Sequence, residues 1–203
     1  METYTPTAIQ GSVAGNFYQI LRWKLSDVPS LVTKIQILSV FLFFLSGIPL
    51  MVLALWNGKS AGSFTFDFRE IGICFAAFAS WPAMIVLHEL VHGLTMRIFG
   101  ARPQYGVRLK QLLFYATAPG YGFRRNAYII LALAPLALLS VLAILGISIF
   151  QGTACAVLLA FCAAFNIGGA AGDLAIVRMV LGYSEKAYIV DEQDGFRVLM
   201  RAE

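Results

Sequence analysis

The two histidines of the chain and a glutamate beside them are the residues best suited to chemistry. They lie in the stretch VLHELVHGL, residues 86–94, as His88, Glu89 and His92. On an α-helix, residues i and i+4 lie on one face with their Cβ atoms about 6 Å apart, so two imidazoles at this spacing can bind one metal ion. Glu89 is turned one step away and reaches a water molecule at that metal more readily than the metal itself, as a general base does. The spacing therefore predicts a metal site with acid–base chemistry.

The composition indicates what surrounds this motif. Hydrophobic residues make up 59% of the 203 residues and charged residues 13%, which is typical of integral membrane proteins. The net charge of +4 requires no nucleic acid, because basic residues gather at the ends of apolar segments, where they contact lipid headgroups. The first residues do not combine a basic segment with a short apolar run, so we expect no cleavable signal peptide. The lipid bilayer is therefore the expected environment.

Four segments are long enough to cross a hydrocarbon core, which takes about 20 apolar residues per helix. We predict them at residues 35–56, 71–99, 126–150 and 153–181, and the second contains the histidine motif. The last two come from one uncharged run, Ala127 to Gly172, that is about twice as long as one crossing needs and must turn, most simply at FQGT, residues 150–153. With no internal repeat or linker, residues 1–203 are predicted to form a single membrane-embedded domain of the all-α class.

Lysine and arginine are distributed unevenly about these segments. One predicted side of the bilayer has only Lys59 and Arg69, balanced by Asp67 and Glu70. The other side holds the remaining basic residues, namely Arg22, Lys24, Lys34, Arg97, Arg102, Arg108, Lys110, Arg124, Arg125, Arg178, Lys186, Arg197 and Arg201. By the positive-inside rule, the protein is multi-pass with both termini in the cytoplasm.

Three further segments are neither clean spans nor simple loops. The Gly- and Pro-punctuated stretch from Gly100 to Asn126 contains VRLKQLLFYAT, which favours strands or a re-entrant hairpin dipping into the bilayer. In the tail, AYIV and FRVLM flank DEQDG, which predicts a small hairpin with Asp194 and Gly195 in the turn. NFYQILRWKL, residues 16–25, is either a strand or an interfacial segment. These short β-hairpin or re-entrant elements are expected on the cytoplasmic side of the helices.

A third metal ligand is needed, since catalytic zinc usually takes three protein ligands and leaves a position for water. The chain has no further histidine, and besides Glu89 only Asp173, in NIGGAAGDLAIV, is a carboxylate embedded in a predicted span. Counted from the arginine at the end of its span, Glu89 lies eight residues in and Asp173 five. At about 1.5 Å per residue, both acids lie at roughly the same depth. We predict Zn²⁺ bound by His88, His92 and Asp173; the alternative for Asp173 is a buried acid hydrogen-bonded to Ser, Thr or an interfacial arginine.

Small residues and an asparagine precede that aspartate. Gly168 and Gly172 form a GxxxG spacing, which predicts close packing of the fourth helix on the second. Asn166 lies about two turns before Asp173 and shares its face. Two roles are open for Asn166, namely hydrogen bonding to a substrate backbone or hydrogen bonding between helices.

These residues resemble the site-2 protease class of intramembrane metalloproteases, whose hallmark is HExxH on one membrane helix and an aspartate on a later one. The segments HELVHG, FGARPQYG, YATAPGYGFRRNAYI, LAPL and GDL are more closely similar to a bacterial membrane family named Putative zincin peptidase, whose function is unknown. The resemblance covers roughly residues 71–181. Two features depart from the site-2 protease pattern: GDL stands in place of Leu-Asp-Gly, and no proline separates Asn166 from Asp173.

The resemblance implies an intramembrane zinc metalloendopeptidase, with Glu89 as the general base and zinc held by His88, His92 and Asp173. Its partner would be a membrane protein or peptide substrate, cleaved in or near a bacterial cytoplasmic membrane. The alternative is a non-catalytic metal-binding membrane adaptor, an inactive protease relative that binds client helices without cutting them. The sequence identifies neither the substrate nor the oligomeric state.

Overall fold

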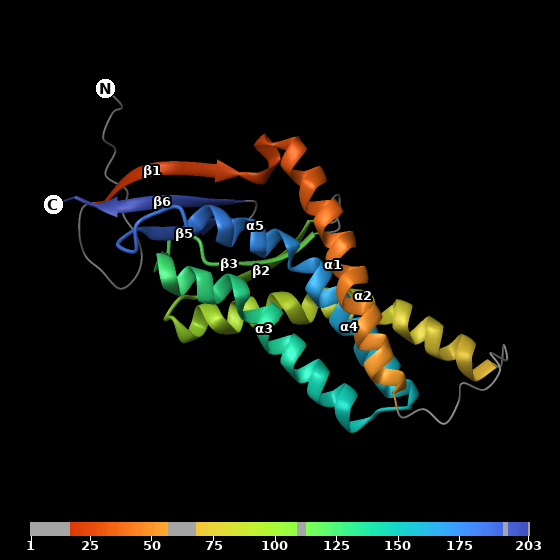
Figure 1. Ribbon diagram of the computed structural model, residues 1–203. Coiled ribbons are helices and arrows are strands. Elements are labelled where there is room, and N and C mark those ends of the chain that lie inside the picture. The colour runs from red at the N-terminus through yellow and green to blue at the C-terminus, as the bar shows by residue number, and fades with distance from the viewer. Residues whose placement is uncertain (1–16, 57–67, 109–112, 193–194, 203) are drawn as a thin grey trace. The chain divides into compact units, whose positions relative to one another are not determined.

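The computed structural model describes residues 17–56, 68–108, 113–192 and 195–202. Helices and strands both occur in this part of the chain (Figure 1). The helices are the 3-10 turn η1 (Leu25–Asp27), α1 (Pro29–Leu55), α2 (Phe68–Ile98), α3 (Arg125–Ile149), α4 (Ala154–Gly169) and α5 (Ala171–Val180). The strands are β1 (Phe17–Lys24), β2 (Gln104–Arg108), β3 (Leu113–Thr117), β4 (Gly122–Arg124), β5 (Tyr188–Glu192) and β6 (Gly195–Arg201).

The prediction of an all-α fold is wrong, because the chain forms two β-sheets besides its helices. One is a four-stranded antiparallel sheet of order β1-β6-β5-β4, and the other is the hairpin β2-β3. The segment that the sequence left open as a strand or an interfacial element forms β1. The sequence predicts two strands of this sheet, β5 and β6, as a hairpin, but no local pattern predicts that β1 and β4 pair with them from distant parts of the chain.

Two hairpins lie where the sequence suggested them. The tail hairpin pairs β5 with β6 in a register that places Ile189 opposite Val198, and Asp194 of its predicted turn lies outside the described residues. The segment after α2 forms the hairpin β2-β3, with Tyr105 opposite Ala116, and residues 109–112 lie outside the described part. Strands therefore replace the re-entrant alternative for the described residues of this segment.

The chain divides into two compact units. The first, the sheet unit, comprises residues 1–35, 89–134 and 173–203, and the second, the helical unit, comprises residues 36–88 and 135–172.

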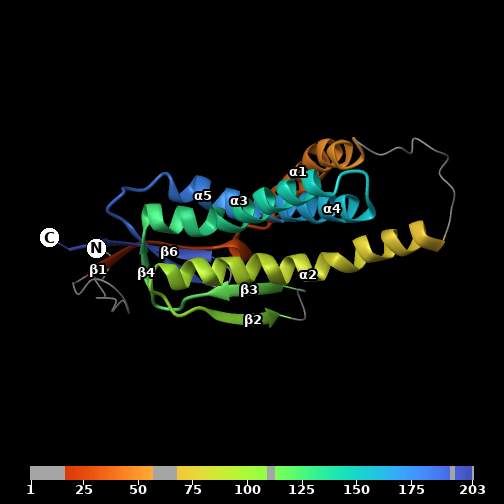
Figure 2. The ribbon, with the colours of Figure 1, turned by 90° about the horizontal axis from the view of Figure 1, so that it is seen from below.

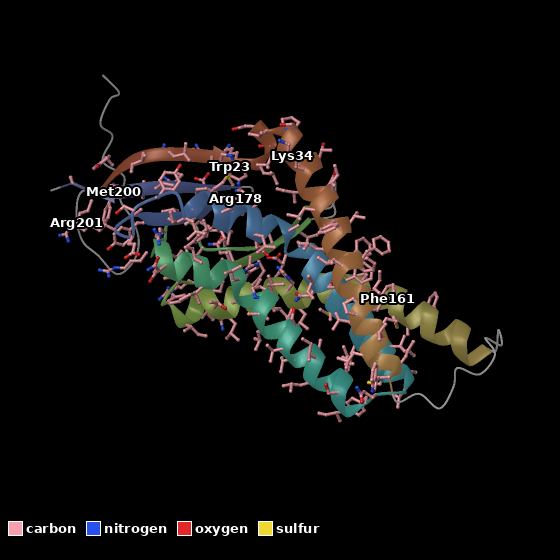
Figure 3. All side chains as sticks on the ribbon, viewed as in Figure 1. Trp23, Lys34, Phe161, Arg178, Met200 and Arg201 are labelled. Carbon is pink, nitrogen blue, oxygen red and sulfur yellow. The ribbon has the colours of Figure 1, made fainter. Side chains whose placement is uncertain are left out.

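The sheet unit is organised around both faces of its four-stranded sheet. Successive strand residues point to opposite faces, so Ile189 and Val190 of β5 enter different clusters. The larger cluster buries Met96, Ala101, Ala118, Phe123, Tyr128, Leu131, Val180, Ala187, Ile189, Phe196 and Val198. Trp23 of β1 and Met200 of β6, labelled in Figure 3, pack against it partly buried, and the Trp23 ring lies 5.5 Å from that of Phe196. This core joins the sheet to residues of α2, α3 and α5, namely Met96, Tyr128, Leu131 and Val180.

In the helical unit, α1 and α4 approach closely through small residues. A Cβ at Gly168 would lie 3.0 Å from the Ser39 carbonyl oxygen and 3.2 Å from the Phe43 Cβ, both in α1. Gly168 therefore faces α1 rather than α2, although α4 does contact α2 elsewhere, for example where Cys162 Sγ donates to Ser80 Oγ at 3.3 Å. The ring of Phe161, labelled in Figure 3, lies 5.8 Å from that of Phe43. Small side chains permit this approach, and aromatic rings fill the space beside it.

Three helical segments in the described part of the chain are long and apolar enough to cross a membrane, namely Pro29–Leu55, Arg125–Ile149 and Ala154–Val180. Large apolar side chains are exposed along them, such as Ile48 at 65% and Val141 at 56%. Such exposed apolar surface suits contact with lipid rather than water. α2, which corresponds to the predicted span 71–99, is not among the three, so a fourth crossing stays a prediction.

Candidate metal centre

His92 is held by a backbone carbonyl on one side and faces a carboxylate on the other. It lies in α2, is 8% exposed, and its Nδ1 is 3.1 Å from the Leu131 carbonyl oxygen of α3. A carbonyl can only accept, so Nδ1 carries the hydrogen and donates it. Nε2 then keeps its lone pair, and it lies 3.5 Å from the Oδ1 atom of Asp173. The ring is thus oriented with its metal-binding nitrogen toward Asp173.

His88 is oriented by Asn166 in a corresponding way. Its Nδ1 lies 3.0 Å from Asn166 Oδ1. The amide nitrogen of Asn166 donates to the Pro135 carbonyl at 3.3 Å and to the Ser140 hydroxyl at 3.4 Å, which fixes the amide with its oxygen toward the histidine. Nδ1 of His88 is therefore the donor, and Nε2 is its metal-binding atom.

The last apolar segment is interrupted shortly before Asp173. The predicted helix 153–181 is interrupted at Ala170, which caps the C-terminus of α4, and α5 begins at Ala171. Asp173 consequently lies in the first turn of α5, where the partial positive charge of the helix N-terminus stabilises a carboxylate.

The three predicted ligands have a spacing that suits zinc. His88, His92 and Asp173 each offer one ligand atom, and these atoms lie within 4.8 Å of one another. Ligands at about 2.0–2.1 Å from a tetrahedral zinc lie roughly 3.3 Å apart, close to the 3.5 Å between His92 Nε2 and Asp173 Oδ1. Two imidazoles and one carboxylate are also a donor set that zinc accepts in catalytic sites. This group could hold a metal ion.

Glu89 accepts a hydrogen bond from the β2-β3 hairpin. The backbone N–H of Ala116 in β3 donates to Glu89 Oε2 at 2.7 Å. Residues 89–98 of α2 run alongside this hairpin (Figure 2), and Gly93 makes the approach possible because a Cβ there would overlap the Tyr105 side chain of β2. A backbone donor favours the ionised carboxylate, which is the form that acts as a base.

A further carboxylate, that of Asp191, is partly buried in the sheet unit. The Tyr128 hydroxyl donates to Asp191 Oδ1 at 2.8 Å. Burial raises the pKa of Asp191 from its ordinary value of 3.8 to about 6, although the hydrogen bond from Tyr128 acts in the opposite direction. The sequence suggested no role for Asp191, because nothing in its spacing to other residues distinguishes it from a solvent-exposed tail residue.

The orienting groups of the two imidazoles also escaped the sequence interpretation. A backbone carbonyl such as that of Leu131 cannot be identified from its side chain. Pro135, four residues later, is a usable signal, because a proline inside a helix lacks the N–H that would bond to that carbonyl. For Asn166, the structure shows the bonds to His88, Pro135 and Ser140, which are contacts between helices of the helical unit. Its proposed contact with a substrate stays a prediction.

An HExxH helix whose histidines lie beside an aspartate from another helix defines a site of the metal-dependent hydrolase class. Comparison with known families agrees with that class. Residues 82–188 match the model of the family described as Putative zincin peptidase, and the chain belongs to this family. The family implies a metallopeptidase that uses zinc. Neither the curated proteins nor the solved structures contain a match to the chain.

Proposed function

We propose that this protein is an intramembrane zinc metallopeptidase, of the site-2-protease kind, that hydrolyses peptide bonds of membrane-associated substrates. The observation that carries the proposal is the grouping of ligand atoms from His88, His92 and Asp173 within 4.8 Å, with Glu89 next to the first ligand in the chain. Family membership supports the peptidase chemistry, and the three apolar helices support the membrane location.

The catalytic roles follow from the geometry of each side chain. Bound zinc would supply Lewis acidity and lower the pKa of a coordinated water to about 7. Glu89 takes a proton from the attacking water and passes it to the departing amine, which is a role for a carboxylate that stays ionised. The Leu131 carbonyl and the Asn166 amide keep the two imidazoles in the tautomer that presents Nε2.

The β2-β3 hairpin offers a place for an extended substrate. Within the described residues, β3 pairs with β2 in a two-stranded sheet, so one edge of β3 is not paired to a strand there. The Ala116 N–H, which bonds Glu89, lies on that edge. A substrate segment that adds to β3 would therefore pass beside Glu89. A helical substrate would have to unwind first, because a helix hides its carbonyls in its own hydrogen bonds.

Glu89→Gln tests this function against the adaptor alternative. Glutamine keeps the size of the side chain and an acceptor for the Ala116 N–H but removes the base. Zinc binding should persist, while cleavage should fall by about 10² to 10⁴-fold, as is typical when general acid–base catalysis is lost. Comparing membrane proteomes of cells that express either form should reveal a membrane protein that accumulates uncut with the variant.

The control is Glu192→Gln, a carboxylate that pairs with Arg22 and Arg197 in the sheet unit rather than with site residues in the described structure. It should leave the proteome as in wild type. If Glu89→Gln fully replaces the wild-type protein in cells from which the gene has been deleted, the peptidase proposal is rejected and a non-catalytic adaptor is favoured.

A further inference from the structure

Pro135 occupies the position in α3 that frees the carbonyl used by His92. In a helix, the N–H of residue i bonds the carbonyl of residue i−4, so the residue at 135 would normally bond Leu131. Proline has no N–H, and the Leu131 carbonyl therefore lacks this helical partner. That carbonyl accepts from His92 Nδ1 at 3.1 Å instead. A buried carbonyl needs a donor, and the histidine supplies it.

The carbonyl of the same proline residue takes part in holding the other imidazole. Asn166 is 3% exposed, and its amide nitrogen donates to the Pro135 carbonyl and the Ser140 hydroxyl. With both amide hydrogens engaged, the amide oxygen of Asn166 is directed to His88 Nδ1. Reversal of the amide would place its nitrogen against the histidine and leave the Pro135 carbonyl without this donor.

We infer that Pro135 and Asn166 are positioning residues of the metal centre, each fixing the tautomer and ring orientation of one histidine. Pro135 acts on His92 by leaving the Leu131 carbonyl available, and Asn166 acts on His88 directly. This inference rests on the proposed function only in taking zinc as the bound metal. Groups that orient a ligating histidine typically contribute 10–100-fold to metal affinity.

A purely structural role for Pro135 predicts that zinc affinity changes only if the stability of the protein changes too, whereas the positioning role predicts a loss of affinity without a loss of stability. Pro inside a helix is unfavourable by about 3 kcal/mol relative to Ala, so Pro135→Ala should leave the helix as stable or more stable. The new N–H at position 135 would, however, compete with His92 for the Leu131 carbonyl. We expect zinc affinity to fall 10–100-fold although the thermal stability of the metal-free protein does not fall.

The matched control is Pro49→Ala, which removes a proline from the interior of α1. It should leave zinc affinity unchanged. For the second histidine, Asn166→Ala should weaken zinc binding, and Asn166→Asp should restore part of it, because a carboxylate accepts from His88 Nδ1 but cannot donate to the Pro135 carbonyl. Affinity is measured by competition between a chelator and the full-length protein in lipid nanodiscs, with Zn²⁺ as the only added ligand.

A second readout needs neither metal nor activity. The chain has only two histidines, so ¹⁵N NMR of labelled imidazoles can resolve both rings in the metal-free protein. Wild type should show the Nδ1–H tautomer for both. Pro135→Ala should disturb the signals of His92 alone, and Asn166→Ala those of His88 alone.

The outcomes separate the inference from the function on which it rests. If the wild type binds zinc and both variants keep the wild-type tautomers and zinc affinity, the positioning roles are wrong and the metallopeptidase proposal is unaffected. Absence of zinc binding in the wild type would overturn the proposed function, and the inference with it.

Discussion

At the scale of residues, the metal centre depends on the hydrogen bond that each imidazole makes through its Nδ1 atom. His92 donates to a carbonyl of α3, and His88 donates to Asn166. The i, i+4 spacing of the histidines could be interpreted from the sequence because it is local to one helix. The residues that orient them come from other helices, and no sequence spacing predicts which carbonyl or amide will face which ring.

Asp191→Asn should change how stability depends on pH. Because the folded-state pKa of Asp191 is about 6 rather than 3.8, its contribution is fully present below about pH 3.8 and is lost as the pH rises through about 6. Asparagine keeps an acceptor for Tyr128 but cannot ionise, so the variant should be more stable than wild type at pH 7.5, by up to roughly 3 kcal/mol. At pH 4 the two should differ little.

Thermal unfolding of the metal-free protein in detergent, followed between pH 4 and 7.5, measures this difference. Asp27→Asn, at an exposed position in η1, is the control and should keep the wild-type pH dependence. If thermal stability changes with pH in the same way in wild type and in Asp191→Asn, the raised pKa of Asp191 is contradicted.

At the scale of elements, the helices could be predicted from the sequence and the four-stranded sheet could not. Long uncharged runs identify helices by length and composition; each of the first three predicted spans corresponds to one helix, and the fourth contains both α4 and α5. The sequence predicts the β5-β6 hairpin from AYIV, FRVLM and the turn between them, but it does not predict that β1 and β4 pair with this hairpin, because those strands lie far away in the chain. The break at Ala170 was also missed, although the Gly168–Gly169 pair before it is a recognisable point of weakness in a helix.

Gly93→Ala should disturb the seating of the β2-β3 hairpin on α2. A Cβ at this position would overlap the Tyr105 side chain. The overlapping atoms are the outer end of the half-exposed Tyr105 ring, which can turn aside, so the cost should lie near the lower end of the roughly 1–3 kcal/mol typical of overpacking, and Tyr105→Ala should remove it. A double-mutant cycle on thermal stability would measure the coupling. Additive effects of the two substitutions would show that the hairpin does not rest on Gly93.

At the scale of the whole molecule, three helical segments of the described residues are long and apolar enough to cross a membrane, and we propose that they embed the protein in the bilayer. The lysine and arginine distribution predicts that both termini are cytoplasmic and that the α3–α4 turn lies on the far side. In that turn, Gly152 adopts a φ of +73° and Thr153 caps α4.

A cysteine at Gln151 tests this orientation. In a background without Cys74, Cys155 and Cys162, a membrane-impermeant thiol reagent should label position 151 from outside the cytoplasm. A cysteine at Lys186, which is exposed between α5 and β5, should be labelled only from the cytoplasm and serves as the control. Labelling of position 151 only from the cytoplasm would overturn the orientation.

The metal content of the purified protein tests the central claim most directly. Elemental analysis of wild type after mild purification should find about one zinc per chain, because two imidazoles and one carboxylate form a catalytic zinc site. His88→Ala, His92→Ala and Asp173→Ala should each lower that content, whereas Asp191→Asn, which alters a carboxylate outside the ligand set, should retain it. No zinc in the wild type, or full zinc in Asp173→Ala, would contradict the proposed centre.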